Sequence, residues 1–279
     1  MPVDHYENFP VASWVLPRAL RRPIEVIYAF ARTADDLADE GDRAPAQRLA
    51  ALQAFREELV RIAGREPART PLFRDLASVI DTHRLPLAPF HDLLDAFTQD
   101  VTCTRYADFA QVLDYCRRSA NPVGRLLLHL YGRAEPGSLA RSDSICTALQ
   151  LVNFLQDVAR DWTIGRVYLA QDELRAAGID ESQIAQGRVD DRWSGFMHAQ
   201  AERAAGMLVR GAPLARELPG RAGLELRLVV AGGLRIARRV QAVRGDVFRR
   251  RPVLGWRDWM AVAARAAWYP PATAAEVAR

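Results

Sequence analysis

Apolar residues recur every three or four positions through most of the chain, which is the spacing of one face of an α-helix. Alternating runs of β-branched and aromatic residues, which indicate strands, are scarce. Stretches rich in proline and glycine separate the periodic segments, and each predicts a helix end. These stretches are Pro17 and Pro23, 65–71, 84–89, 132–138, the surroundings of Gly165, 176–180, 211–220 and 249–255. The pattern predicts an almost entirely α-helical protein.

The breaks between helices are short, and none is a long polar linker. The sequence contains no internal repeat of fixed period. Hydrophobic residues make up 49% of its 279 positions, which is enough for a substantial core. We therefore expect residues 1–279 to form a single all-α domain.

Acidic side chains interrupt the first long apolar run, which we expect to be helical from about Pro23 to Asp39. Proline is tolerated in the first turn of a helix, where its missing N–H is not needed. At about 100° per residue, Tyr28, Arg32, Asp35 and Asp39 fall within an arc of about 60°. One face of this helix therefore carries two carboxylates one turn apart.

A second segment, 145–162, repeats this arrangement on a helix that is otherwise largely apolar. Its polar residues Gln150, Asn153, Asp157 and Asp161 fall within an arc of about 80°. Like charges four residues apart repel one another, and inside a core they require a counter-ion. Because aspartate oxygens are hard ligands and no histidine or cysteine accompanies them, the two stripes favour Mg²⁺ over zinc. The alternative for each stripe is a solvated acidic face.

Composition narrows the chemistry that the chain can perform. All 38 basic residues are arginine, so lysine-based nucleophiles and phosphate loops are excluded. The three cysteines, at 103, 116 and 146, lack metal-ligand spacing and favour a reducing, cytoplasmic setting. The 34 acidic residues are interspersed with the basic ones, so the net charge of +4 does not indicate a nucleic-acid partner. We found neither a signal-peptide pattern nor an apolar run long enough to span a membrane.

Several segments resemble the squalene and phytoene synthase family, whose members join or rearrange prenyl diphosphates. Its two aspartate-rich motifs are similar to "DDLAD" (35–39) and "NFLQDVARD" (153–161). The segments "DHYENF" (4–9), "YAFART" (28–33), "YCRRSANPVG" (115–124) and "GRVYL" (165–169) extend the likeness over nearly the whole chain. Within the family, these segments look most like the bacterial hydroxysqualene synthases of hopanoid biosynthesis.

The resemblance implies an isoprenoid-synthase fold with a central cavity. It implies that Asp35, Asp39, Asn153, Asp157 and Asp161 hold Mg²⁺ ions against the diphosphate of a prenyl diphosphate substrate. It further implies substrate contacts from His5, Phe9, Arg32, Gly124, Gln150, Arg166 and Tyr168. It also leaves room for peripheral membrane contact, at the inner face of the membrane, and for contact with other enzymes of the pathway.

Tyr28 and Tyr115 are the candidate catalytic tyrosines, because a cavity that handles carbocations needs aromatic faces. Each could instead be a core tyrosine with a satisfied hydroxyl. In "SANPVG", Pro122 removes a helical hydrogen bond and predicts a kink beside Tyr115 and Gly124. We hypothesise that Asn121 and the freed carbonyl hold the water that ends the reaction. The alternative is a kink that only shapes the cavity.

Two positions depart from the family pattern. Gln156 stands where many relatives have arginine, and Ala170 where relatives usually have proline. Both positions are expected to affect how the chain binds the diphosphate. We interpret Arg235, Arg238 and Arg239, with the arginines at 249–251, as a mainly solvated basic face. Segment 256–269 mixes tryptophan, arginine and alanine, which suits either an interfacial helix or a terminal helix packed on the domain.

The expected reaction is Mg²⁺-assisted ionisation of presqualene diphosphate, rearrangement of the cation and capture by water, giving hydroxysqualene and diphosphate. The nearest alternative is a sibling synthase of presqualene diphosphate, dehydrosqualene or phytoene. A metal-dependent phosphohydrolase could also use paired aspartates, but it would accept short diphosphates. A non-catalytic helical interaction protein would release no diphosphate. The chain has no G-x-G-x-x-G fingerprint for nicotinamide, which disfavours reduction to squalene.

Overall fold

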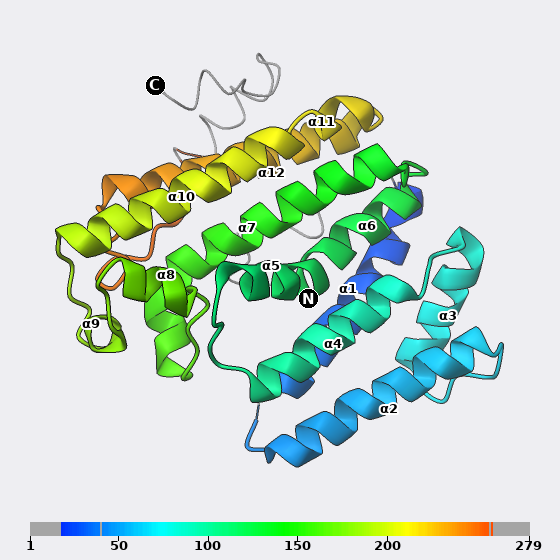
Figure 1. Cartoon of the computed structure of the whole chain (residues 1–279). Coiled ribbons are helices and arrows are strands. Elements are labelled where there is room, and N and C mark those ends of the chain that lie inside the picture. Colours follow the sequence, from blue (N-terminus) through cyan, green and yellow to red (C-terminus); the bar gives the residue numbers. More distant parts are fainter. Residues whose placement is uncertain (1–17, 40, 257, 259–279) are drawn as a thin grey trace.

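The computed structural model describes residues 18–39, 41–256 and 258, and helices form most of them (Figure 1). The helices are α1 Arg18–Asp39, α2 Pro45–Ala63, α3 Pro71–His83, α4 Ala88–Thr102, α5 Phe109–Ser119, α6 Asn121–Leu130, α7 Pro136–Thr163, α8 Gln171–Ala176, α9 Glu181–Ala185, α10 Asp191–Gly211, α11 Leu214–Glu217 and α12 Gly220–Ala242. The predicted all-α class is confirmed. His5 and Phe9 lie outside the described residues.

The helices form two groups, each around its own apolar core. In Figure 1, α7, α10 and α12 lie side by side, and α1 to α4 form the other group. A cluster of phenylalanines, Phe30, Phe55, Phe73 and Phe90, fills the N-terminal core with ring centroids 4.9–5.9 Å apart. In the second core, the fully buried Trp193 of α10 donates its indole N–H to the carbonyl of Gly245. Helix α6 contributes Leu126 and Leu130 to the N-terminal core while packing against α7.

The first helix extends further than its sequence predicts. Pro23 lies inside α1, five residues after Arg18, and not in the first turn of a helix that begins there. The expectation of a break at Pro23 is therefore wrong. Its ring is buried on the apolar face with Ile24 and Ile27, and this packing offsets the missing backbone hydrogen bond.

The proline at position 122 produces a break between two helices. Helix α5 ends at Ser119 and α6 begins at Asn121, with Ala120 between them. Pro122 therefore lies in the first turn of α6, where its missing N–H is tolerated. The predicted kink beside Tyr115 and Gly124 is thus a change of helix direction, and it sets α6 against both cores.

Two segments that follow long helices run side by side and bring the two halves together. The amide of Val167, after α7, donates to the carbonyl of Thr104, after α4, at 3.0 Å. The amide of Gln171 donates in the same way to the carbonyl of Tyr106 at 3.0 Å. This pairing places residues 166–168, from the end of α7, directly beside the end of α4.

Candidate active site

The two predicted carboxylate stripes lie on α1 and α7. Asp35 is half-buried and Asp39 more exposed on α1, whereas Asp157 is buried at 6% exposure on α7. Asp161 and Asn153 are half-buried on α7, one turn to either side of Asp157. Neither stripe is therefore a fully solvated acidic face.

Arg166 joins the two stripes. It follows Gly165, whose positive φ of 79° turns the chain out of α7. Its guanidinium donates to both carboxylate oxygens of Asp39, at 2.9 and 2.6 Å, and to the backbone carbonyl of Asp100 at 2.9 Å. The same guanidinium opposes the rise that burial causes in the pKa values of the Asp35 and Asp161 carboxyls. Arg166 therefore binds Asp39 of α1 directly and lies close enough to Asp161 of α7 to act on its charge.

The site carries more negative charge than its arginines neutralise. Burial raises the pKa of the Asp35 carboxyl to about 6, and repulsion from Asp39 adds to this effect. Burial likewise raises the pKa of Asp161 to about 7, with repulsion from Asp157 as the second cause. Both shifts are directed against the ionised form, as expected for buried carboxylates whose positive partners are too few. Further positive charge would therefore stabilise the ionised site.

Asp157 is held by an arginine that the sequence did not link to it. Arg251, which follows α12, donates from its Nε to one oxygen of Asp157 and from its Nη2 to the other, the latter at 3.0 Å. The side chains are 22% and 8% exposed, respectively. The interpretation of 249–251 as solvated is therefore wrong for Arg251. It holds for Arg235, whose side chain is 48% exposed, although Arg235 and Arg239, the latter 38% exposed, both bind the buried Asp258.

Asp100 is a site residue that the sequence analysis missed. This carboxylate of α4 is 6% exposed and accepts hydrogen bonds from the hydroxyls of Tyr115, at 2.8 Å, and Tyr168, at 3.3 Å. Burial raises the pKa of Asp100 to about 7, against the opposing effect of Arg166. A signal was present, because Asp100 follows the buried Phe97 by three residues on the apolar face of α4.

Aromatic rings surround this aspartate. Tyr168 stacks on Phe154 of α7 with 4.1 Å between the centroids and 2° between the planes. Tyr115 packs against Tyr106 and Tyr168 at 5.5 and 5.4 Å. Burial raises the pKa of the Tyr115 hydroxyl well above its ordinary value. Tyr115 and Tyr168 are therefore neutral, and both direct their hydroxyl groups to the Asp100 carboxylate.

Other predicted residues lie along the same helices. Arg32 pairs with Asp35 at 3.4 Å and with Asp36 at 2.9 Å, so it neutralises part of the first stripe. Tyr28 is half-buried one turn before Arg32. Gln150 is half-buried on α7, two turns before Asp157.

Gly124 and Asn121 lie where α6 crosses α7. A Cβ atom on Gly124 would stand 2.3 Å from Ser142 Oγ and 2.6 Å from Cys146 Sγ, so the close approach of the helices requires glycine here. This contact accounts for Gly124 without a ligand. Asn121 is 5% exposed, and its side-chain oxygen accepts a hydrogen bond from Thr147 Oγ1 at 2.9 Å. The amide is thereby fixed in orientation.

The donor set fits a divalent cation that is shared with a substrate. Over the described ranges, no three acidic, histidine or cysteine side chains come close enough to hold an ion by themselves. Mg²⁺ is usually held by one or two carboxylates, waters and the phosphates of a substrate. The i,i+4 carboxylate pairs of α1 and α7, with their raised pKa values, match that requirement. They do not match a structural zinc site, in which protein ligands alone enclose the ion.

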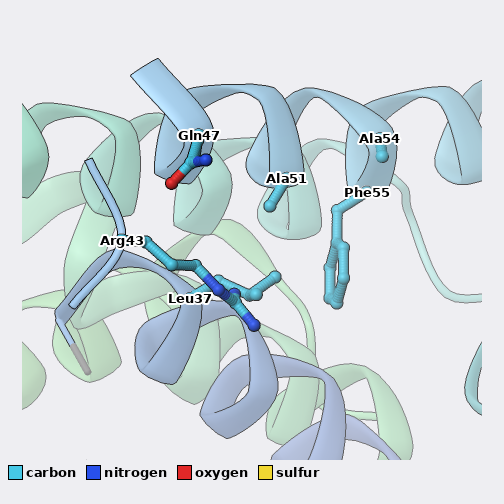
Figure 2. A pocket seen from close by; sticks show the side chains of 6 residues that line it. All are labelled: Leu37, Arg43, Gln47, Ala51, Ala54 and Phe55. Atoms are coloured by element: carbon cyan, nitrogen blue, oxygen red, sulfur yellow. The ribbon is translucent and has the colours of Figure 1, made fainter. Parts of the chain in front are cut away.

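A pocket of about 570 Å³ lies between α1 and α2, away from the carboxylates. Figure 2 shows Leu37 of α1 facing Ala51 and Phe55 of α2, with Arg43 at one side. Leu37 is two residues from Asp35 and therefore on the opposite side of α1. This pocket is not the candidate active site.

The sequence matches a family model described as squalene/phytoene synthase over residues 3–258. The hydroxysqualene synthase of Rhodopseudomonas palustris is 38% identical over 84% of this chain and 80% of its own length. The hydroxysqualene synthase of Sinorhizobium fredii is 34% identical over 76% of this chain and 71% of its own length. The phytoene synthase of Mycobacterium tuberculosis is 32% identical over 71% and 65%.

The fold of this chain also resembles those of solved structures. The crystal structure of squalene synthase HpnC from Alicyclobacillus acidocaldarius is 38% identical, with a TM-score of 0.80 over 86% of this chain and 90% of that one. A dehydrosqualene synthase in complex with a ligand is 21% identical, with a TM-score of 0.80 over 94% and 91%, and supports the fold alone. Among the described helices of this chain, none combines the length and apolarity that crossing a membrane requires.

Proposed function

The chain belongs to the squalene/phytoene synthase family, and from this premise we propose that it is a hydroxysqualene synthase. The reaction would convert presqualene diphosphate and water into hydroxysqualene and diphosphate. Three relatives named hydroxysqualene synthase, at 34–39% identity, support this assignment. The single structural observation that carries it is that Arg166, which follows α7, binds both carboxylate oxygens of Asp39 on α1.

We propose that Asp35, Asp39, Asn153, Asp157 and Asp161 hold Mg²⁺. The bound cations would supply positive charge to the departing diphosphate, which lowers the barrier to ionisation. Arg32 and Arg166 are already placed among these carboxylates, and we propose that they bind the diphosphate oxygens directly. Gln150 lies on the same face of α7 and would orient the diphosphate by hydrogen bonding.

The aromatic rings beside Asp100 are suited to the carbocation that ionisation leaves behind. Tyr115, Phe154 and Tyr168 form an aromatic cluster, and aromatic rings attract positive charge without forming a bond. We propose the same role for Tyr28, which shares a helix face with Arg32 and Asp35. His5, Phe9 and Gly124 stay predicted substrate contacts, and the first two lie outside the described residues.

We further propose that Asn121 places the water that captures the rearranged cation. Its side-chain oxygen is engaged by Thr147, so its NH₂ group has a fixed direction. Capture forms a carbon–oxygen bond, and the water then loses a proton to give the alcohol. Product analysis of Asn121→Ala tests this role. A hydroxysqualene fraction equal to that of the wild type would show the role to be wrong, whereas loss of the alcohol with continued diphosphate release supports it.

One experiment separates the proposed function from its alternatives. Purified protein and Mg²⁺ are incubated separately with farnesyl diphosphate and with presqualene diphosphate, and the organic products and diphosphate are measured. Hydroxysqualene from presqualene diphosphate supports the proposal. Presqualene diphosphate or dehydrosqualene from farnesyl diphosphate would identify a sibling synthase, and phytoene from a parallel incubation with a C20 prenyl diphosphate would do the same. Hydrolysis of a short diphosphate in a further parallel incubation would indicate a phosphohydrolase.

A further inference from the structure

The residues after α12 are fastened to α7 and α12 at several points. We call residues 251–256 together with Asp258 the C-terminal strap. Arg239 of α12 donates to the carbonyl of Val253, and the amide of Gly255 donates to Asp258 at 2.8 Å. Asp258, at 3% exposure, also accepts from Arg235 at 3.0 Å and from Arg239. The strap therefore has a defined register on the two helices.

Two adjacent residues of α7 hold two adjacent residues of the strap. The side-chain NH₂ of Gln156 donates to the carbonyl of Pro252, and both residues are buried. Asp157, which follows Gln156 in α7, accepts hydrogen bonds from Arg251, which precedes Pro252 in the strap. The neutral Gln156 thus anchors the backbone at the point from which Arg251 reaches Asp157. The cation that neutralises Asp157 therefore comes from the strap.

The Arg251–Asp157 pair is in conflict with a divalent cation at the same carboxylate. Both oxygens of Asp157 are engaged by a guanidinium, and the group is almost entirely removed from water. A buried carboxylate needs a positive partner, but a guanidinium and a doubly charged ion on it would repel each other strongly. An incoming diphosphate offers a negative partner to the displaced guanidinium, which binds phosphate well.

We propose that Arg251 is an exchangeable partner of Asp157, positioned by Gln156. Without substrate, Arg251 neutralises Asp157. When a divalent cation takes Asp157, the guanidinium transfers to the diphosphate and holds it. This inference rests on the proposed function, because it takes Asp157 to be a ligand of the cation. Gln156 is a positioning residue, since it acts only by holding the strap.

The exchange predicts opposite effects on two ligands in Arg251→Gln. Mn²⁺ binding in the absence of substrate is measured by the loss of the free-ion EPR signal. In the variant, Mn²⁺ no longer competes with Arg251 for Asp157. If the pair is closed in about nine molecules of ten, its removal tightens Mn²⁺ binding about tenfold. Binding of inorganic pyrophosphate at saturating Mg²⁺ is measured by calorimetry. Pyrophosphate loses one charge-assisted hydrogen-bond partner in the variant and binds about tenfold more weakly. Gln156→Leu has the same two effects as Arg251→Gln, tighter Mn²⁺ binding and weaker pyrophosphate binding, each by a smaller factor.

Arg249→Gln is the matched control. Arg249 lies two residues away and pairs with Asp246 on the surface, so its loss leaves both affinities unchanged. Circular dichroism verifies that each variant is folded. If Arg251→Gln does not fold, Arg251→Lys provides the test, because one ammonium cannot engage both oxygens as the guanidinium does and Mn²⁺ again binds more tightly.

These binding measurements distinguish failure of the exchange from failure of the proposed function. Tighter Mn²⁺ binding together with weaker pyrophosphate binding supports the exchange. Unchanged affinities, or two affinities that move in the same direction, overturn it even if the wild type converts presqualene diphosphate. If the wild type binds neither Mn²⁺ nor pyrophosphate and converts no presqualene diphosphate, the proposed function fails and the exchange fails with it.

Discussion

Replacing Arg166 by glutamine removes the group that ties the segment after α7 to Asp39 of α1 and to the end of α4. The Arg166 side chain is 12% exposed and that of Asp39 is 33% exposed, so the pair is largely shielded from solvent. A hydrogen bond to a charged group contributes about 1.5–3 kcal/mol, and partial exposure of Asp39 reduces this value. Arg166 makes two such bonds with Asp39 and one with the Asp100 carbonyl. We expect Arg166→Gln to lower the free energy of unfolding of the metal-free protein by about 2–3 kcal/mol.

Mg²⁺ provides the diagnostic part of this prediction. Because the variant leaves several carboxylates without compensation, saturating Mg²⁺ should stabilise Arg166→Gln more than it stabilises the wild type. Chemical denaturation with and without Mg²⁺ measures both quantities. Arg203→Gln is a matched control, since Arg203 of α10 binds both oxygens of Glu173 of α8 at 3.1 and 2.7 Å and makes no contact with the carboxylates of α1 and α7 that the structure describes.

A double-mutant cycle with Asp39→Asn tests the contact itself. The two substitutions remove the same pair of hydrogen bonds, so their effects should fall short of additivity by about 1–2 kcal/mol. A cost below about 0.5 kcal/mol for Arg166→Gln would refute this reasoning. A Mg²⁺ response no larger than that of Arg203→Gln would also refute it.

Three further predictions follow from individual contacts. Gly124→Ala should destabilise the protein by about 1–3 kcal/mol in denaturant melts, because its Cβ would overlap Ser142 Oγ and Cys146 Sγ, and Ser142→Gly should recover part of the loss. Asp100 has a pKa raised to about 7 when folded, so its contribution to stability is complete below pH 3.8 and is lost as pH rises to about 7. Melts of Asp100→Asn should therefore show a flatter decline over that range, and an unchanged slope would contradict the assignment. Chelation by EDTA should abolish diphosphate release and excess Mg²⁺ should restore it, whereas undiminished release after chelation would exclude the metal role.

Sequence periodicity was sufficient for the fold class and for the two carboxylate stripes. The helical arc shared by Asp157 and Asp161 is a local property, and so is the arc shared by Asp35 and Asp39. The break at Ala120 also followed from a local signal, the proline at 122. Residues within one or two turns of each other are fixed relative to one another by the helix, so their pattern can be read directly.

The contacts between distant segments could not be predicted in this way. Arg251 and Asp157 are 94 residues apart, and no local pattern indicates that they pair. The same holds for Arg166 and Asp39, whose contact depends on the pairing of the segments after α4 and α7. The error at Pro23 has another cause, since tertiary packing of its buried ring outweighs the local preference for a helix start.

Asp100 was not predicted because, unlike Asp157 and Asp161, it has no second carboxylate at helical spacing on its own helix face. A single aspartate on an apolar helix face is an equally strong sign of a site, because its burial has to be compensated. Its partners, the hydroxyls of Tyr115 and Tyr168, come from two other segments and were visible only in the structure.

The central claim is that the α1 and α7 carboxylates act together on one diphosphate. The most direct measurement is the rate of Mg²⁺-dependent diphosphate release from presqualene diphosphate by the wild type, Asp35→Asn, Asp157→Asn and the double variant. Residues that act as a unit are not additive. We predict that each single variant loses at least about a hundredfold in rate and that the double variant loses little more. Single variants with near wild-type rates, or losses that multiply in the double variant, would contradict the claim.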